Sequence, residues 1–305
     1  MRARPCQQRN SRMIQLMHNV DRRIWASVTI VIALAPFILP SAQAQEGAAP
    51  DSRQTNGKSA IALAYRAIGG ERAIQRVRTF VLEGALRAGF NGLTAEPSDR
   101  PAGVSIQAIL PEHYLRVERH EHMLSRQGFS AGVPISDYEP LTPDARLFAS
   151  PPGPKFIDLQ RMRLTYLLIG MFADARGVVP LKADRSRTDA HGLSVEFVGP
   201  EGQAFWLDIN QMNGVPERVR YFDTVQYPER PLNEADRAAG KVPPQKTERA
   251  EVTITFEDRR PVQGLQLPHG IRRTAAGRRF EEIRVDRFVI NPALKSSDFL
   301  TPIKR

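Results

Sequence analysis

The sequence predicts an α+β protein in which a curved antiparallel sheet of about ten strands forms an open, incomplete β-barrel covered by helices. Three observations lead to this prediction. From Thr79 onward, short segments alternate apolar and polar residues with a period of two, which is typical of strands with one buried face. Turn residues such as Asn213-Gly214 separate neighbouring segments, as in hairpins. Residues 155–174 instead have the period of an amphipathic helix.

The start of the chain has the parts of an export signal. The uncharged apolar run Ile24–Leu39 follows Arg22-Arg23 and precedes Ala42-Gln43-Ala44. This order of a basic flank, a short apolar run and a small-x-small site predicts a secretory signal peptide that is cleaved after Ala44. The run is short for a membrane span, which needs about 20 apolar residues, although a retained anchor is the alternative. Translation starts at Met1 or Met17, and the predicted location is the periplasm.

The sequence divides into three parts. Residues 1–44 are the predicted signal peptide. Residues 45–58 contain no apolar residue except alanine, which predicts a flexible tether. Residues 59–305 are expected to form a single domain, because the strand pattern resumes after each interruption. The interruptions are two polar loops, near residues 131–154 and 223–249.

Two helical segments are expected to cover the sheet. Ser59 can cap a helix that runs to Ile68 and ends at Gly69-Gly70, with a short turn, Glu71–Gln75, after it. The second segment, Lys155–Asp174, has an apolar stripe at helical spacing, formed by Leu164, Leu167, Leu168, Met171 and Phe172. Because a Pro- and Gly-rich loop precedes this helix and suits a hinge, we expect the helix to be a lid over an apolar cavity.

The apolar positions of the strand segments predict one continuous inner face. Such a face, curved and covered by helices, encloses a concave apolar space that is filled either by side chains or by a ligand, and the pattern is compatible with both. The residues expected to line this space are Phe80, Leu82, Leu86, Ile106, Ala108, Leu115, Phe205, Leu207, Val252, Ile254 and Phe256 from the strands, and Leu164, Leu168 and Met171 from the helix.

The composition limits the kinds of function. The chain has 43 Lys and Arg, 33 Asp and Glu and a net charge of +10, and the six Arg and one Asp of the signal peptide account for +5 of it. The remaining +5, on an exported protein, argues against a nucleic-acid partner. The single cysteine, Cys6, excludes an intramolecular disulfide and a zinc site built from Cys pairs. Arginine pairs such as Arg259-Arg260 indicate either contact with an anionic membrane surface or a solvated strand face.

Few residues are candidates for catalysis. On a strand, His120 and His122 share a face and could hold a metal with a third ligand such as His113, as in a metal-dependent hydrolase. The alternative is that they are polar residues on a strand surface, because the sequence has no helical His-Glu-x-x-His pair. Gly128–Gly132 superficially resembles a nucleophile elbow but lacks the alternating strands and helices around that motif. Because the mature chain has no Cys, only five His and no helical ligand pair, we predict no metal. Because phosphate-loop and dinucleotide motifs are absent as well, we predict no catalytic residue and no cofactor.

Five segments follow one another along the chain in the order of a known protein family. They are Ala67–Gly70 before a first strand that carries Gly84, Leu110–Glu118, Leu207–Val219, Phe256–Pro268, and Ile290–Leu294 with Phe299 and Pro302. Together they resemble the periplasmic carriers of outer-membrane lipoproteins with the LolA/LolB-like fold, and related sensors that bind stray lipoproteins. The resemblance covers nearly all of residues 59–302 and implies an open barrel that holds acyl chains under helical lids. The length of the chain and its two long loops are those of a divergent member.

We therefore predict a periplasmic carrier or sensor protein that binds an apolar group, a lipid or a lipoprotein acyl chain, without catalysis. Burial of acyl CH₂ groups at about 0.8 kcal/mol each supplies the affinity. Besides the lipid, the expected partners are an envelope protein or an anionic membrane surface, and nucleic acid is not expected. Two alternatives remain open. One is the hydrolase built on His120 and His122, and the other is a structural or regulatory module of an envelope complex.

Overall fold

The computed structural model describes residues 57–88, 101–142, 152–189, 192–199, 202–228 and 244–300. The predicted signal peptide with its cleavage site, and residues 45–56 of the predicted tether, lie outside the described residues. Parts of both predicted loops, residues 143–151 and 229–243, lie outside them as well. In the described ranges, no helix is long and apolar enough to cross a membrane.

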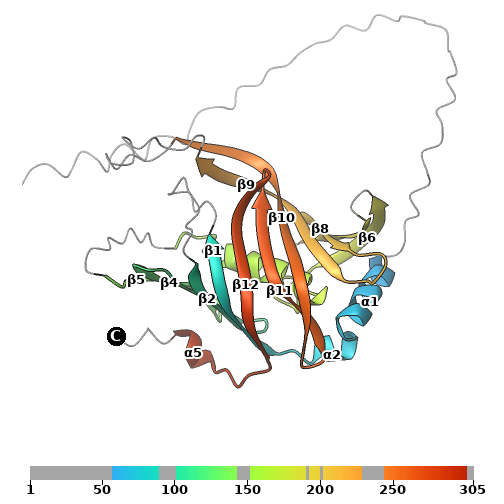
Figure 1. Cartoon of the computed structure of the whole chain (residues 1–305), viewed down its shortest axis with the longest axis horizontal. Helices are drawn as coiled ribbons and strands as arrows, with labels where there is room; N and C mark the ends of the chain where they lie inside the picture. Colours follow the sequence, from blue (N-terminus) through green and yellow to red (C-terminus); the bar gives the residue numbers. More distant parts are fainter. Residues whose placement is uncertain are drawn as a thin grey trace, which may run out of the picture. The chain divides into compact units, whose positions relative to one another are not determined.

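Twelve described strands form one antiparallel sheet (Figure 1). The strands are β1 (Thr79–Ala88), β2 (Ala102–Ile109), β3 (His113–Arg119), β4 (Met123–Ser130), β5 (Val133–Pro140), β6 (Lys182–Asp189), β7 (Gly192–Val198), β8 (Ala204–Ile209), β9 (Pro216–Pro228), β10 (Gln245–Val262), β11 (Leu265–Ala275) and β12 (Arg278–Ile290). Their spatial order is β5-β4-β3-β2-β1-β12-β11-β10-β9-β8-β7-β6. Because β5 and β6 stand at the two ends of this order, the sheet is open. The predicted open, curved antiparallel sheet is confirmed.

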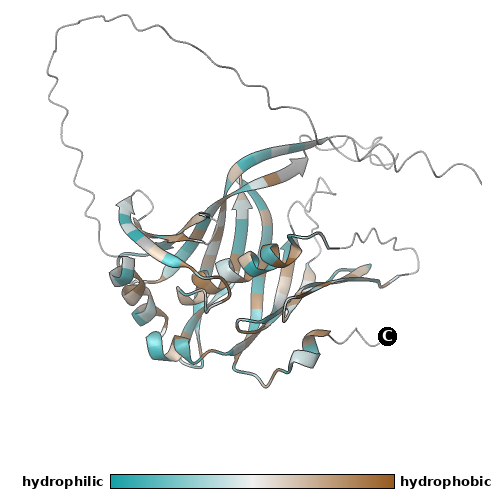
Figure 2. Ribbon diagram, turned by 180° about the vertical axis from the view of Figure 1, so that it is seen from behind, coloured by the Kyte–Doolittle hydropathy of each residue, from teal (hydrophilic) through white to brown (hydrophobic). Residues whose placement is uncertain are grey.

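Helices lie on both faces of the sheet. The N-terminal helices are α1 (Gly57–Ile68) and α2 (Glu71–Gln75), and α3 (Phe156–Phe172) follows β5. Figures 1 and 2, drawn from opposite sides, show α3 lying across one face, which we call the inner face. The short helix α5 (Ser296–Leu300) contacts β3 and β4 on the opposite, outer face.

Helix α1 packs one side against the sheet, and its C-terminal end lies against the turn between β10 and β11. Its buried residues fall at the three- and four-residue spacing of a helix face. They include Ala60, Ile61, Ala64 and Ile68. A Cβ at Gly69, which has a φ of 140°, would lie 2.3 Å from the carbonyl oxygen of Gly264. Only glycine permits this close approach of the backbones, so Gly69 fixes the end of α1 against the β10–β11 turn.

The inner face holds the main hydrophobic core. Residues that pair across an antiparallel ladder point to the same face, so the pairs Leu82 with Ile106 and Phe80 with Ala108 form continuous inner rows. All four side chains are buried, and they belong to one cluster with the buried residues of α1 and α3. A smaller cluster on the outer face contains Leu115, Ile135 and Phe299.

A buried ion pair orders the outer face of β7, β8 and β9. Asp208 is 1% exposed and accepts hydrogen bonds from Nε and Nη2 of Arg220, both at 2.8 Å, and from Oγ of Ser194 at 2.7 Å. Trp206 lies beside this pair, with the Arg220 guanidinium 6.0 Å from the ring centroid and Phe222 meeting the ring edge-on at 6.3 Å. These contacts give the buried polar groups on the outer face their hydrogen-bond partners, while the opposite, inner face of the same strands packs into the core.

The structure corrects several expected boundaries. Strands β4, β5 and β6 are not in the sequence prediction, and the predicted loop near 131–154 is wrong for Val133–Pro140, which forms β5. Strand β9 continues to Pro228 and β10 begins at Gln245, so the predicted loop near 223–249 is shorter than expected. Helix α1 begins at Gly57, so Gly57 and Lys58, which were expected in the tether, belong to the helix. Strands β5 and β6 stand at the edges of the sheet, where polar residues on both faces hide the alternation of a half-buried strand.

Candidate functional site

The structure brings together thirteen of the fourteen residues that were predicted to line a concave space. Twelve of them are buried in the main inner cluster, and the thirteenth, Ile254, packs against that cluster while partly buried. They come from β1, β2, β8, β10 and α3. Their contact with a ligand stays a prediction.

Leu115 is the exception, and its prediction was wrong. It points to the outer face and belongs to the smaller cluster under α5. Its neighbours Tyr114 and Arg116 occupy the inner face, because they pair with Ala108 and Ile106 across the β2–β3 ladder. Since α5 buries Leu115 from outside, the apolar alternation of β3 marks the outer face, and the inner face of this strand carries the buried Tyr114 and the paired charges of Arg116 and Glu118.

The space beneath the C-terminal half of α3 is filled by side chains. Leu164, Leu168 and Met171 have no exposed surface. A Cβ at Gly170 would lie 1.9 Å from Cζ of Phe256, so the helix backbone rests directly on the ring of a β10 residue. We expected a lid over an open cavity, and at this position the helix is part of the packed core.

The C-terminal end of α3 is fixed to three strands by one guanidinium. Nη2 of Arg259 donates to the carbonyl oxygens of Gly170 at 2.7 Å and Pro216 at 2.8 Å, and Nη1 donates to that of Gln266 at 2.8 Å. Burial lowers the pKa of Arg259 to about 10, so the group is still charged at neutral pH. The hinge was expected before α3, and this anchor holds the opposite end of the helix.

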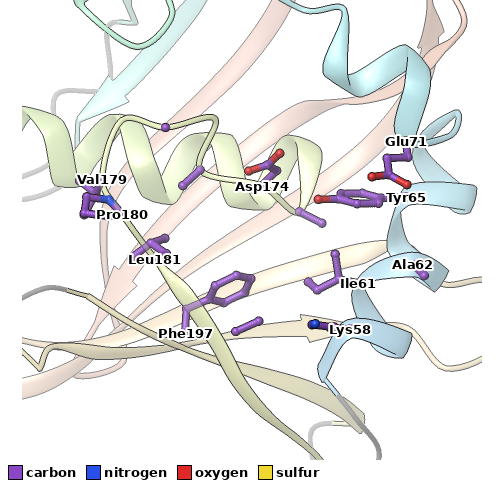
Figure 3. A pocket seen from close by; sticks show the side chains of 14 residues that line it. Lys58, Ile61, Ala62, Tyr65, Glu71, Asp174, Val179, Pro180, Leu181 and Phe197 are labelled. Carbon is purple, nitrogen blue, oxygen red and sulfur yellow. The ribbon is translucent and has the colours of Figure 1, made fainter.

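An open cavity of about 570 Å³ lies beyond the C-terminal end of α3, between α1, residues 173–181 and the strands β6 and β7 (Figure 3). Its apolar lining residues are Ile61, Ala62, Ala173, Ala175, Val179, Pro180, Leu181, Ala183 and Phe197. Lys58, Glu71 and Asp174 add charged groups. The volume lies within the range of about 300–1,000 Å³ that is typical of small-molecule sites. None of the fourteen predicted residues lines this cavity, and its main signal in the sequence is the number of alanines, whose small side chains leave space.

Hydrogen bonds hold one wall of this open cavity in place. Nη2 of Arg176 donates to the carbonyl oxygens of Gln75 and Val77, both at 2.9 Å, and the Arg176 backbone N–H donates to Oδ1 of Asp174 at 2.9 Å. Tyr65 faces the wall from α1, as Figure 3 shows. Burial and the nearby carboxylate of Asp174 raise the pKa of Tyr65 to about 12, so its hydroxyl stays neutral at pH 7.

A row of aromatic rings leads from the open cavity to a second, smaller one. Phe197 stacks on Phe205 with the ring centroids 5.3 Å apart, and Phe205 meets Tyr166 edge-on at 5.4 Å. Tyr166 in turn stacks on Tyr221 at 4.0 Å. Phe197 lines the open cavity, whereas Tyr166 and Tyr221 line a cavity of about 60 Å³ between α3 and the sheet. We call this second space the small cavity.

One side of the small cavity is a network of paired charges. Nη1 and Nη2 of Arg116 donate to the two carboxylate oxygens of Glu281 at 3.3 and 3.0 Å, and Nε donates to Glu118 at 2.6 Å. Glu118 also contacts Nε2 of His120 at 3.1 Å. Burial raises the pKa of Glu118, but the His120 hydrogen bond and the Arg116 charge outweigh it and bring the pKa down to about 2. Glu118 is therefore ionised at neutral pH.

The three histidines considered as metal ligands do not converge. His113 is on the outer face, with Nδ1 2.8 Å from Oγ of Ser130 and Nε2 3.3 Å from Oγ of Ser296. His120 contacts Glu118, and His122 lies 3.9 Å from its neighbour Glu121. No group of three His, Cys, Asp or Glu side chains among the described residues could hold a metal ion.

Ser130, the serine of the elbow-like segment, has a histidine partner but not the surroundings of a nucleophile. It is 3% exposed and lies at the end of β4. The second nitrogen of His113 faces the Ser296 hydroxyl, where a catalytic triad places a carboxylate. These bonds link β3, β4 and α5, which gives Ser130 a structural role.

No family model matches the chain, and no curated protein gives a significant match. Among solved structures, a LolA superfamily protein from Nitrosomonas europaea is 13% identical with a TM-score of 0.40, and the match covers 80% of this chain and 97% of that one. A domain assigned as an outer membrane lipoprotein-sorting protein from Vibrio parahaemolyticus is 10% identical with a TM-score of 0.40, with the same two coverages. The strand order and pairing, rather than this likeness, define the fold.

Proposed function

We propose that the chain is an exported, periplasmic carrier or sensor protein that binds an apolar group, a lipid or a lipoprotein acyl chain, without catalysis. The open cavity beyond α3 is the observation that carries the proposal. Its lining is mostly apolar, and it is already formed with the core packed around it. Apolar groups that enter such a space leave water without a rearrangement of the sheet.

We place the apolar part of the ligand beyond the C-terminal end of α3, not beneath the half of the helix that carries Gly170. The contact of Gly170 with Phe256 leaves no room for an acyl chain under the second half of the helix. The open cavity accepts a bent or short segment of chain, with Phe197 and Leu181 as walls. Each buried CH₂ group contributes about 0.8 kcal/mol to binding.

The hydrolase alternative has little support from the site. Nε2 of His120 lies 3.1 Å from Glu118 and Nε2 of His122 lies 3.9 Å from Glu121, while His113 contacts Ser130 and Ser296 on the outer face of the sheet. Of the charged groups that line the open cavity, Glu71 and Asp174 lie beside Tyr65.

The experiment fills the cavity from its wall and measures uptake of an uncharged dye, N-phenyl-1-naphthylamine. Ala183 lines the cavity from β6, so Ala183→Trp fills part of it. The preceding residue, Lys182, points to the other face of the same strand and is exposed, so Lys182→Trp is the matched control.

We expect saturable dye binding by the wild type, a loss of about tenfold in affinity for Ala183→Trp, and no change for Lys182→Trp. A wild-type protein that takes up no dye would refute the proposal. Equal binding by Ala183→Trp and the wild type would show that the dye occupies another place, and the assignment to this cavity would then be wrong.

A further inference from the structure

The small cavity between α3 and the sheet differs from the open cavity in size and in chemistry. Its volume of about 60 Å³ is too small for an acyl chain, although it exceeds the roughly 10–15 Å³ that one water molecule needs. Its apolar walls are Ile106, Leu167, Ile254, Ile271 and Ile283. Three arginines, three tyrosines and one glutamate also line it. The space therefore suits a small polar group surrounded by an apolar wall.

The three arginines of the small cavity are not equivalent. Arg116 is engaged with Glu281 and Glu118, so its charge is balanced inside the protein. In contrast, no carboxylate of the described residues lies within 4.0 Å of the guanidinium nitrogens of Arg163 or Arg273. Among the described residues, these two guanidinium groups therefore have no ion-pair partner within 4.0 Å, and Glu281 acts on both from a longer distance.

Arg273 projects from β11 and is only partly satisfied. It hydrogen-bonds Tyr221 and lies 5.8 Å from the ring centroid of Phe280. Its Nε is buried without a hydrogen-bond partner. Buried polar atoms in proteins nearly always have a partner, so this N–H calls for one that the described residues do not supply.

Arg163 approaches the same cavity from α3. Its Nη1 donates to Oε1 of Gln127 at 3.2 Å, and its side chain is otherwise exposed at the mouth of the cavity. The hydroxyls of Tyr166 and Tyr221 add two donors, and burial raises the pKa of both phenols, so they stay protonated. Asp223 faces the same side further along β9 but does not line the cavity.

We propose that the small cavity is a subsite for a single anionic oxygen group, a carboxylate or a phosphate, at the head of an alkyl chain, with Arg273 and Arg163 as its partners. This inference rests on the proposed function and narrows its ligand from any apolar group to an anionic amphiphile. A carboxylate accepts two parallel hydrogen bonds from one guanidinium, and such charge-assisted bonds are about twice as strong as neutral ones. The paired charges of Arg116 and Glu281 form the fixed wall of the subsite.

The test compares amphiphiles that share one alkyl chain and differ in their head. Isothermal titration of the purified exported protein uses dodecanoate, dodecyl phosphate, dodecanol and dodecyltrimethylammonium. The variants are Arg273→Met, Arg163→Met and, as matched control, Arg272→Met. Arg272 is the neighbouring residue on β11, points to the opposite face and pairs with Glu257 on the surface. Near-UV circular dichroism checks that each variant is folded.

We expect the wild type to prefer the anionic heads to dodecanol by about tenfold and to bind the cationic amphiphile worst. Arg273→Met is expected to lower the affinity for the anionic ligands about tenfold and to change the affinity for dodecanol by less than about twofold. We expect a smaller loss of affinity for the anionic ligands in Arg163→Met and no loss in Arg272→Met. Whichever of dodecanoate and dodecyl phosphate binds more tightly identifies the head group that the subsite prefers. If Arg273→Met does not fold, Arg163→Met decides, because its side chain is exposed.

Two results would overturn the inference in distinguishable ways. If dodecanol binds as tightly as dodecanoate and neither arginine variant changes this, the anion subsite is wrong while the apolar carrier remains. If neither the amphiphiles nor the uncharged dye bind, the proposed function is wrong, and the proposal of the anion subsite is wrong as well.

Discussion

Nη2 of Arg259 lies 2.7 Å from the carbonyl oxygen of Gly170, in the last turn of α3. The last four carbonyl groups of a helix have no intrahelical donor, and here a strand side chain supplies one. Among the described residues, the same guanidinium has no carboxylate within ion-pair distance, and it also donates hydrogen bonds to the backbone carbonyl oxygens of Pro216 and Gln266. A single side chain therefore positions the helix that separates the two cavities.

Arg259→Met tests this anchor. The variant keeps the apolar part of the side chain and leaves three carbonyl groups without their donor, so we expect the free energy of unfolding to fall by about 2 kcal/mol or more in urea titrations. Arg260→Met is the control, because the neighbouring Arg260 is exposed and its ion-pair partner among the described residues is Asp258. If the two variants lose the same stability, the bonds of Arg259 to α3 are not important for the fold.

Gly170→Ala tests the contact between α3 and β10. Alanine favours a helix over glycine by about 1 kcal/mol, so without a clash the variant would be stabilised. Because the new Cβ would lie 1.9 Å from the Phe256 ring, we expect a net loss of about 1–3 kcal/mol, measured by thermal and urea unfolding. Adding Phe256→Leu should restore part of this loss. Gly103→Ala is the control, since its Cβ would meet only the Cβ of Arg119 at 3.8 Å. A more stable Gly170→Ala variant would contradict the close packing.

The lowered pKa of Glu118 predicts that the protein loses stability in acid. Its pKa is about 2 in the folded chain against 4.5 for a free side chain. A carboxylate with a lowered pKa in the folded state contributes stability above its unfolded pKa and loses it as the pH falls toward the folded pKa. We therefore expect the free energy of unfolding to decline between about pH 4.5 and pH 2, with about 3 kcal/mol attributable to Glu118.

The measurement for Glu118 is a series of urea titrations from pH 7 to pH 2.5 on the wild type and Glu118→Gln. Glutamine cannot ionise, so the variant should be less stable than the wild type at pH 7 and approach it at the acid end. Glu281, whose pKa Arg116 also lowers against the effect of burial, remains in both proteins and contributes the same slope to each. If the free energies of unfolding of the two proteins change with pH in parallel, the contacts of Glu118 do not lower its pKa and the prediction is wrong.

The start of the mature protein is a direct test of export. We expect a chain expressed with its leader to be recovered from the periplasm with Gln45 as its first residue, because Ala42-Gln43-Ala44 has the small-x-small pattern of a cleavage site. N-terminal sequencing of the recovered protein measures this. A protein that begins at Met1 or Met17 would support the retained anchor instead.

The sheet could be predicted from the sequence where one face of a strand is apolar and the other is in water. Val252, Ile254 and Phe256 alternate with polar residues, and the structure places them on the inner face of β10. The same rule failed at Leu115, because α5 returns from the far end of the chain and buries the outer face there. It also failed at the edge strand β6, Lys182–Asp189, whose residues are polar on both faces.

Neither cavity could be predicted from the pattern of residues. The apolar stripe of α3 predicted that the helix covers the sheet, but how closely it approaches depends on one missing side chain, at Gly170, opposite one ring, Phe256. The charges of the small cavity come from α3, β3, β11 and β12, so their proximity follows from the strand order rather than from any short motif.

Trp206 has a practical consequence for spectroscopy. It is the only tryptophan in the described part of the chain, and it lies on the outer face beside the Arg220 guanidinium, with the sheet between it and both cavities. Its emission therefore reports the opening of the β7–β9 surface on denaturation and is expected to stay silent when a ligand enters. The tyrosine absorption bands of Tyr166 and Tyr221, whose rings stack at the small cavity, are the optical signal in which occupancy should be visible.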